Sequence, residues 1–228
     1  MEAKRLLLFD IDGTLVSTAG AGIESLKIVI ADRYGARDDL HGIEVAGKTD
    51  ANIAADILKK YHVDPTRENV AAFLDEYLAH LARLLPELPG RVLPGISEIL
   101  PQMKSKPNRV LALLTGNIER GAKLKLGHYR LWDFFEFGAF ADDHHDRNEL
   151  GAFARARAQE KHGHEFDAAQ IDVIGDTGHD IACGKAFGAR TIAIATGGWT
   201  REKLSPYQPD FLFDDFANVG EVIDTLGW

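Results

Sequence analysis

Apolar residues gather in short runs along the chain, and a polar or glycine-containing turn follows each run. The runs are rich in Leu, Ile, Val and Phe without polar alternation, which is typical of parallel strands buried on both faces of a sheet. Helical patterns separate the runs, so the rhythm predicts an α/β fold. The expected strands span residues 5–9, 109–114, 171–174, 190–195 and 211–213, with 134–140 as a further candidate, and the expected helices span 96–103, 118–126, 148–162 and 180–187.

The interval from residue 19 to residue 91 breaks this rhythm, because it carries helical patterns and no convincing strand. Apolar residues recur at helical spacing from Ile23 to Ile30 and again from Val70 to Leu84. Asp64 and Pro65 are typical of the cap and the first position of the second of these helices. Small, flexible residues flank the interval on both sides. The sequence therefore predicts a core of residues 1–18 and 92–228, with a helical domain of residues 19–91 inserted after the first strand.

Composition narrows the class of protein. Of the 228 residues, 45% are hydrophobic and 27% are charged, and no apolar run is long enough for a transmembrane helix. A net charge of -9 argues against a general nucleic-acid binder, which needs a concentrated basic surface. The single cysteine excludes an intramolecular disulfide and fits a reducing compartment. We therefore expect a cytoplasmic protein that acts on a small molecule, with neither nucleic acid nor membrane as a partner.

Two carboxylates follow the first expected strand directly. Asp10 and Asp12 lie in the run LFDIDGT, where an apolar strand precedes them and Gly-Thr follows. Ligand sites in open α/β sheets form outside the carboxyl ends of the strands, so both side chains are candidates for chemistry. The structural alternative is a pair of turn and capping carboxylates. The pattern as a whole favours a reactive site.

A second candidate follows the strand at 109–114. Thr115, Gly116 and Asn117 offer a hydroxyl and backbone N–H groups at the start of a helix, which together suit phosphate oxygens. Thr-Gly-Asn is equally a good turn sequence. This motif gains weight only in combination with the others.

A third candidate follows the strand at 171–174, where Asp176 and Asp180 lie four residues apart. Mg²⁺ prefers oxygen ligands and is usually held by one or two carboxylates, water and substrate phosphate. Asp10, Asp176 and the backbone carbonyl of Asp12 would supply such a set. Asp180 either reaches the metal through water or orients a nearby basic residue, and its structural alternative is an acid at the start of a helix.

These motifs resemble those of the haloacid dehalogenase superfamily, in its phosphoglycolate phosphatase and β-phosphoglucomutase branch. The likeness extends over nearly the whole chain. The run from Asp10 to Thr14 matches the first motif of the family, Thr115 the second, and Asp176 with Asp180 the fourth. The resemblance implies a Rossmann-like core with a mobile helical cap and Mg²⁺ as cofactor. It also implies that Asp10 attacks phosphorus and that Asp12 acts as general acid and base.

Two basic residues complete the expected site. The family requires one Lys or Arg between its second and fourth motifs, and Arg147 fits because it follows a candidate strand and opens a helix. Arg155, Arg157 and Lys161 lie further along that helix, on a face expected to be solvated. Lys48 lies in a loop that resembles the one reaching the active site in related phosphatases, where it would contact substrate. The alternative is a surface lysine beside a helix cap.

The reaction expected from these residues is Mg²⁺-dependent hydrolysis of a small phosphorylated metabolite through an aspartyl-phosphate, and the resemblance favours phosphoglycolate. Asp12 and Asp176 argue against a dehalogenase, which needs neither a leaving-group acid nor a metal. A sugar-phosphate mutase similar to β-phosphoglucomutase stays open, since it shares all four motifs. A regulatory or binding protein carrying phospho-aspartate is a further alternative, disfavoured by the general base at Asp12.

Overall fold

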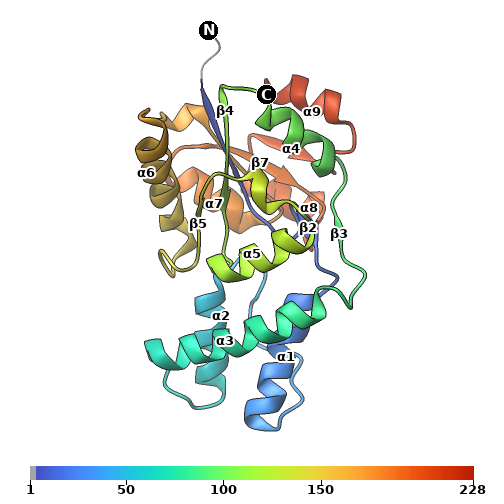
Figure 1. Cartoon of the computed structure of the whole chain (residues 1–228), viewed down its shortest axis with the longest axis vertical. Coiled ribbons are helices and arrows are strands. Elements are labelled where there is room, and N and C mark those ends of the chain that lie inside the picture. The colour runs from blue at the N-terminus through green and yellow to red at the C-terminus, as the bar shows by residue number, and fades with distance from the viewer. Residues whose placement is uncertain (1–3) are drawn as a thin grey trace.

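The apolar runs form a six-stranded parallel sheet within residues 4–228, which are those described in the computed structural model (Figure 1). The strand order is β5-β4-β1-β6-β7-β8, with the first strand of the chain near the centre. Residues 6–9 have no exposed surface, as expected for a strand with neighbours on both sides and helices on both faces. The strands are β1 (Arg5–Phe9), β4 (Arg109–Leu114), β5 (Gly138–Ala139), β6 (Ile171–Gly175), β7 (Arg190–Ile194) and β8 (Phe211–Phe213).

Helices cover both faces of the sheet (Figure 1). Successive side chains of a strand point to opposite faces, so Leu7 and Phe9 pack in one cluster with α4, α5 and α9. Leu6 and Leu8 pack in the other, with α6 and α7. The helices are α4 (Ile96–Lys104), α5 (Glu119–His128), α6 (Leu150–His162), α7 (Gly178–Ala186), α8 (Arg201–Leu204) and α9 (Val219–Leu226), with 3₁₀ turns at Trp132–Phe134, Arg147–Glu149, Ala168–Gln170 and Ser205–Tyr207.

Three helices of the inserted segment lie beyond the carboxyl ends of the strands (Figure 1). They are α1 (Ala21–Tyr34), α2 (Asp50–Lys60) and α3 (Arg67–Leu84), and they pack around a second hydrophobic cluster, which Ile118 and Ala141 of the core join. The segments leading into and out of them pair as a short antiparallel ladder of β2 (Val16–Ser17) and β3 (Arg91–Val92). The pairing brings the two connections together, so the helical unit is joined to the sheet at one place.

The α/β class with a parallel core and a helical insertion is confirmed, and within residues 4–228 no helix is long and apolar enough to cross a membrane. The strand expected at 134–140 is much shorter, because Trp132–Phe134 forms a 3₁₀ turn and only Gly138–Ala139 pairs with β4. β5 is an edge strand in the order of the sheet, so it has one strand partner only.

The expected start of α3 is wrong. The helix begins at Arg67, and its N-cap is Thr66 rather than Asp64. The Thr66 hydroxyl accepts a hydrogen bond from the backbone N–H of Asn69 at 3.2 Å. Thr and Asp are both good N-cap residues, and the one that reaches a free backbone N–H of the first turn fixes the boundary.

Candidate active site

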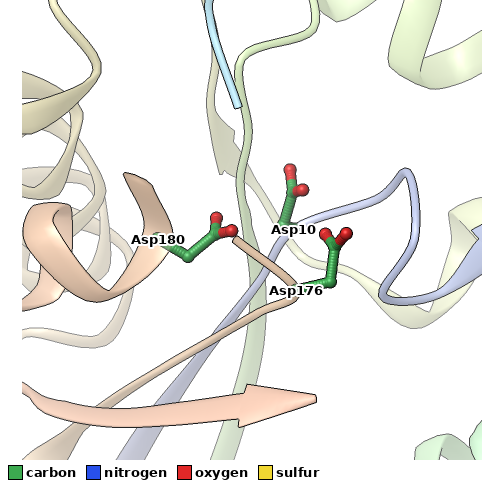
Figure 2. Close-up of side chains that lie close together, drawn as sticks. All are labelled: Asp10, Asp176 and Asp180. Atoms are coloured by element: carbon green, nitrogen blue, oxygen red, sulfur yellow. The ribbon is translucent and has the colours of Figure 1, made fainter. Parts of the chain in front are cut away.

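Three buried carboxylates converge at the carboxyl edge of the sheet. Figure 2 shows Asp10 at the end of β1, Asp176 directly after β6 and Asp180 in the first turn of α7. β1 and β6 are neighbouring strands, which brings the two loops together. Carboxylate oxygens of the three residues lie within 4.8 Å of one another, and none of the residues is more than 6% exposed.

This concentration of negative charge is costly without a cation. Burial raises the pKa of Asp10 to about 6, and the charges of Asp180 and Asp12 add to the rise, while Arg147 opposes it. Burial, with the charges of Asp180 and Asp10, also raises the pKa of Asp176 well above its usual range. The set consists of hard oxygen donors with an excess of negative charge, so it fits a divalent cation such as Mg²⁺.

Gly13 lets the loop after β1 approach the cluster. Its φ angle is +80°, and a Cβ placed on it would lie 2.4 Å from Oδ2 of Asp176. Only glycine tolerates both the left-handed conformation and this approach. The glycine of the LFDIDGT run therefore has a steric role beside the carboxylates.

Arg147 provides the positive charge facing this cluster. It lies in the 3₁₀ turn before α6, its Nη2 is 3.2 Å from Oδ1 of Asp10, and it also pairs with Asp180. Burial alone would lower the pKa of Arg147, but the charges of Asp180 and Asp10 outweigh burial and raise it. The second oxygen of Asp180 accepts a hydrogen bond from the backbone N–H of Thr177 at 2.9 Å. The same carboxylate therefore both caps α7 and orients Arg147.

The other basic residues of α6 lie away from the cluster. Arg155, Arg157 and Lys161 each form an ion pair with an acidic residue outside it. Their partners are Glu165, Asp143 and Glu136, at 3.2, 2.6 and 3.8 Å.

The loop after β4 connects the two carboxylates of the first motif. Thr115 is fully buried and its side chain hydrogen-bonds to Asp10, which lowers the pKa of that carboxyl against the effect of burial. The side-chain amide of Asn117 donates to Oγ1 of Thr115 and to Oδ2 of Asp12, each at 2.9 Å. Thr115 and Asn117 are thereby brought to Asp10 and Asp12, as the sequence predicts.

Lys125 is a site residue that the sequence analysis misses. It lies on α5 and is only 4% exposed, and its ammonium donates to Oδ2 of Asp12 at 2.5 Å and to Oδ1 of Asn117 at 2.6 Å. Burial by itself would lower the pKa of Lys125, but the negative charge of Asp12 outweighs burial and the net effect raises the pKa. The ammonium therefore stays charged. The signal available beforehand is its spacing, because Lys125 lies on the same helical face as the buried Ala122 and Leu126.

Lys48 lines the pocket in front of the carboxylates, but its ammonium faces acidic residues. Nζ lies 3.5 Å from Asp56 and 3.7 Å from Glu44, and the side chain keeps 30% of its surface exposed. Because these ion pairs are long and partly exposed, a ligand can replace them at a small cost in free energy.

The backbone beside Lys48 contacts the loop after β4. The N–H of Asp50 donates to the carbonyl of Gly116 at 2.7 Å, and the Asp50 carboxylate accepts the N–H of Ile118 at 2.9 Å. A Cβ on Gly116 would lie 2.3 Å from the carbonyl oxygen of Lys48. Gly116 therefore permits the contact between the insertion and the core.

A pocket of about 450 Å³ lies between the carboxylates and the helical insertion. Asp10, Asp12 and Arg147 form its polar end. The insertion forms a wall of the pocket that carries Lys48, Asp50 and several apolar side chains. One of these is Ile23, which is 38% exposed although the helical pattern groups it with the buried Leu26 and Ile30. Further apolar side chains along this wall belong to Val45, Ile53 and Tyr77.

Comparison with known proteins identifies relatives over the whole chain. The family model for haloacid dehalogenase-like hydrolases matches residues 7–194. The chain is 29% identical over 220 residues to "Probable phosphatase IndB" of Dickeya dadantii, covering 95% of this chain and 92% of that protein. It is 31% identical over 227 residues to the phosphoglycolate phosphatase of Agrobacterium fabrum, covering 93% and 89%.

A solved structure shares the fold. The crystal structure of CbbY from Rhodobacter sphaeroides in complex with phosphate aligns with a TM-score of 0.75 at 20% identity, covering 95% of this chain and 96% of that one. At this level of identity the match concerns the arrangement of sheet, covering helices and insertion.

Proposed function

This chain belongs to the haloacid dehalogenase-like hydrolase family, and we propose that it is a Mg²⁺-dependent cytoplasmic phosphatase that hydrolyses a small phosphorylated metabolite through an aspartyl-phosphate on Asp10. The observation that carries the proposal is the position of Asp10. Its buried carboxylate lies between the guanidinium of Arg147 and two further carboxylates, and it opens onto a pocket of about 450 Å³. A carboxylate placed in this way suits nucleophilic attack on phosphorus.

The two steps of the reaction divide between the carboxylates of the first motif. Asp10 attacks phosphorus in line and forms an acyl-phosphate while the ester bond to the leaving oxygen breaks. Asp12 gives its proton to that oxygen, then takes a proton from the water that cleaves the acyl-phosphate.

Positive charge must balance the transferring phosphoryl group. Arg147, 3.2 Å from Asp10, and the hydroxyl of Thr115, which hydrogen-bonds to Asp10, would oppose the charge on that group, together with the backbone N–H of Gly116. Asp10, Asp176 and the backbone carbonyl of Asp12, with Asp180 near them, would hold Mg²⁺, and the ion would supply further positive charge for the phosphoryl group.

The insertion, proposed as residues 19–91 against a core of 1–18 and 92–228, would select the substrate. Its contribution to the pocket is one basic side chain, Lys48, one carboxyl, Asp50, and a set of apolar side chains. Phosphoglycolate is the lead substrate, because a relative of 31% identity carries that name and Lys48 suits a carboxylate. The pocket volume of about 450 Å³ leaves room for larger phosphomonoesters.

The decisive experiment measures phosphate release from a panel of phosphorylated metabolites, with Mg²⁺ and with EDTA. We expect release only with the metal, and a loss of more than about 1000-fold in Asp10→Asn, because the nucleophile is removed. Asp224→Asn, which changes an exposed acid of α9, serves as the matched control and should behave as wild type.

Two outcomes would redirect the proposal. Substantial turnover by Asp10→Asn with an unchanged melting temperature would refute an aspartyl-phosphate at this residue. Activation by a bisphosphorylated sugar, with transfer of phosphate between positions of the sugar, would identify a mutase instead.

A further inference from the structure

The active-site region holds two buried cations, and they serve different carboxylates. Arg147 approaches Asp10 and Asp180 from the start of α6. Lys125 approaches Asp12 from α5, at 2.5 Å. Each of the two carboxylates of the first motif therefore has its own cation.

Asp12 needs such a partner to hold one orientation. Its side chain is 41% exposed, since it lies in the loop beyond β1 and lines the pocket. Within residues 4–228 the hydrogen bonds to its carboxylate come from Lys125 and Asn117, and both end on Oδ2. Oδ1 is thereby left for exchange of a proton with the substrate.

Lys125 is itself held firmly. Its ammonium also donates to Oδ1 of Asn117 at 2.6 Å, and the residue is 4% exposed. A buried ammonium without partners is strongly disfavoured, so the lysine keeps these contacts. The side chain of Asn117 bonds to Lys125, Asp12 and Thr115, which makes the group a closed network.

The helical insertion encloses this network from the pocket side. A Cβ on Gly22 of α1 would lie 3.5 Å from the hydroxyl of Tyr77 and 3.9 Å from Nζ of Lys125. Tyr77 of α3 is 3% exposed, and burial raises its pKa above the usual range, so its hydroxyl stays neutral. On the side of the insertion, Lys125 faces the neutral hydroxyl of Tyr77 and the carboxyl of Asp50, whose charge also raises the pKa of the lysine. Asp12 is the carboxylate that the ammonium contacts at hydrogen-bond distance.

We propose that Lys125 is a positioning residue which, together with Asn117, holds Asp12 in the orientation for protonating the leaving oxygen. This inference rests on the proposed phosphatase function. It assigns to Lys125 a task distinct from that of Arg147, because the lysine acts on the departing alcohol through Asp12 and leaves the phosphoryl group to Arg147.

The assignment predicts a dependence on the leaving group. An alkyl phosphate such as phosphoglycolate releases an alkoxide that must be protonated, whereas p-nitrophenyl phosphate releases a phenolate that departs without a proton. Misplacing the general acid therefore slows the first substrate far more than the second.

The experiment compares kcat and KM of wild type, Lys125→Met and Lys123→Met for both substrates. Lys123 is an exposed lysine of the same helix and is expected to behave as wild type when changed. For Lys125→Met we expect kcat for the alkyl phosphate to fall by about 100-fold, kcat for p-nitrophenyl phosphate to fall by less than about 5-fold, and KM to change little. In an Asp12→Asn background the same substitution should have no further effect on the alkyl phosphate.

Two results would overturn the assignment of Lys125, and a third would reject the phosphatase function on which it rests. An equal loss of kcat on both substrates would mean a structural role, and a rise of KM confined to phosphoglycolate would mean that Lys125 binds the substrate carboxylate. Wild-type protein without activity on any substrate would instead reject the phosphatase proposal itself. If Lys125→Met does not fold, Lys125→Gln, which removes the charge but keeps a polar side chain, is compared with wild type on the same two substrates.

Discussion

The carboxyl edge of the sheet and the helical insertion contribute to the same pocket in opposite ways. The sheet edge places ionised groups at short distances, with buried cations directly on buried or half-buried carboxylates. The insertion contributes mostly apolar side chains, with one half-buried lysine, Lys48, and one carboxyl, Asp50, and its helices pack around a hydrophobic cluster.

This contrast between charged and apolar parts suits two different tasks, the reaction at the sheet edge and the choice of substrate by the insertion. Charges taken out of water must be paired closely, so each group at the sheet edge depends on the presence of the others. Apolar contacts are non-directional and tolerate change, so the wall can vary without disturbing the reacting groups. Substitutions at the sheet edge should therefore change both stability and turnover, and substitutions of the apolar pocket residues of the insertion mainly binding.

The largest effect is expected for Arg147→Met. The change leaves Asp10 and Asp180 buried without their guanidinium, which should lower the free energy of unfolding by about 3–5 kcal/mol and kcat by more than about 100-fold. Urea unfolding at neutral pH, with and without Mg²⁺, measures the first quantity, and added Mg²⁺ should restore part of it.

Arg157→Met is the matched control for Arg147. Arg157 pairs with Asp143 at 2.6 Å but its side chain is 38% exposed, so its loss should cost about 1 kcal/mol or less. If the two variants unfold at the same urea concentration, the three buried carboxylates do not depend on Arg147 for their stability, contrary to what is expected of a buried ion pair.

An intermediate effect with a pH dependence is expected at Asp50, where the insertion meets the core. Burial raises the pKa of Asp50 to about 6, against the charge of Lys125 and the N–H of Ile118. A carboxyl whose pKa is higher in the folded state binds its proton more tightly there, so its contribution to stability falls as the pH rises from about 4 to about 6. Asp50→Asn keeps an acceptor for Ile118 and removes the ionisation.

Unfolding of wild type and Asp50→Asn at pH 4, 5 and 7 tests this sign. Between pH 4 and pH 6 the free energy of unfolding of the variant should rise by about 1–2 kcal/mol relative to that of wild type, and the difference should persist above pH 6. Partial exposure of Asp50 limits this difference. Asp64→Asn, in an exposed acid of the same insertion, should show no such margin. A constant difference between wild type and Asp50→Asn at all three pH values would contradict the assignment.

The smallest effect is expected for Lys48→Met. Its ammonium is shared among Glu44, Asp56 and solvent, so its loss should raise KM of a carboxylate-bearing substrate only about 3–10-fold and leave kcat nearly unchanged. Lys59→Met removes a more exposed lysine near the same Asp56 and should leave KM unchanged. A fall in kcat with unchanged KM would place Lys48 with the reacting groups instead.

Sequence alone predicts the sheet edge well, because polar residues follow three of the buried strands, β1, β4 and β6, and parallel strands end at one edge. Asp10, Thr115 and Asp176 follow directly from that rule, and the structure brings them together. Arg147 follows less directly, since several basic residues lie nearby and only the three-dimensional path shows which one turns inward.

Helical spacing indicates buried positions for Lys125 and Ile23, but it does not show what either side chain contacts. Lys125 occupies a buried helical position that pattern rules reserve for apolar residues, and it is stable there only because Asp12, more than a hundred positions earlier, pairs with it. Ile23 occupies a position expected to be packed, yet it faces the pocket. Both depend on contacts between distant segments, which local periodicity does not encode.

The close approach at Gly116 has a consequence for protein engineering. A methyl group at Gly116 would collide with the carbonyl of Lys48, so residues 47–50 and the turn at Gly116 fit together in one geometry only. The helices of the insertion contact the core at further points, since Asp75 of α3 pairs with Arg120 of α5 at 2.5 Å and Gly22 of α1 lies beside Lys125. Grafting a foreign helical unit onto this hydrolase should therefore succeed when residues 47–50 and these contacts of α1 and α3 with α5 are retained.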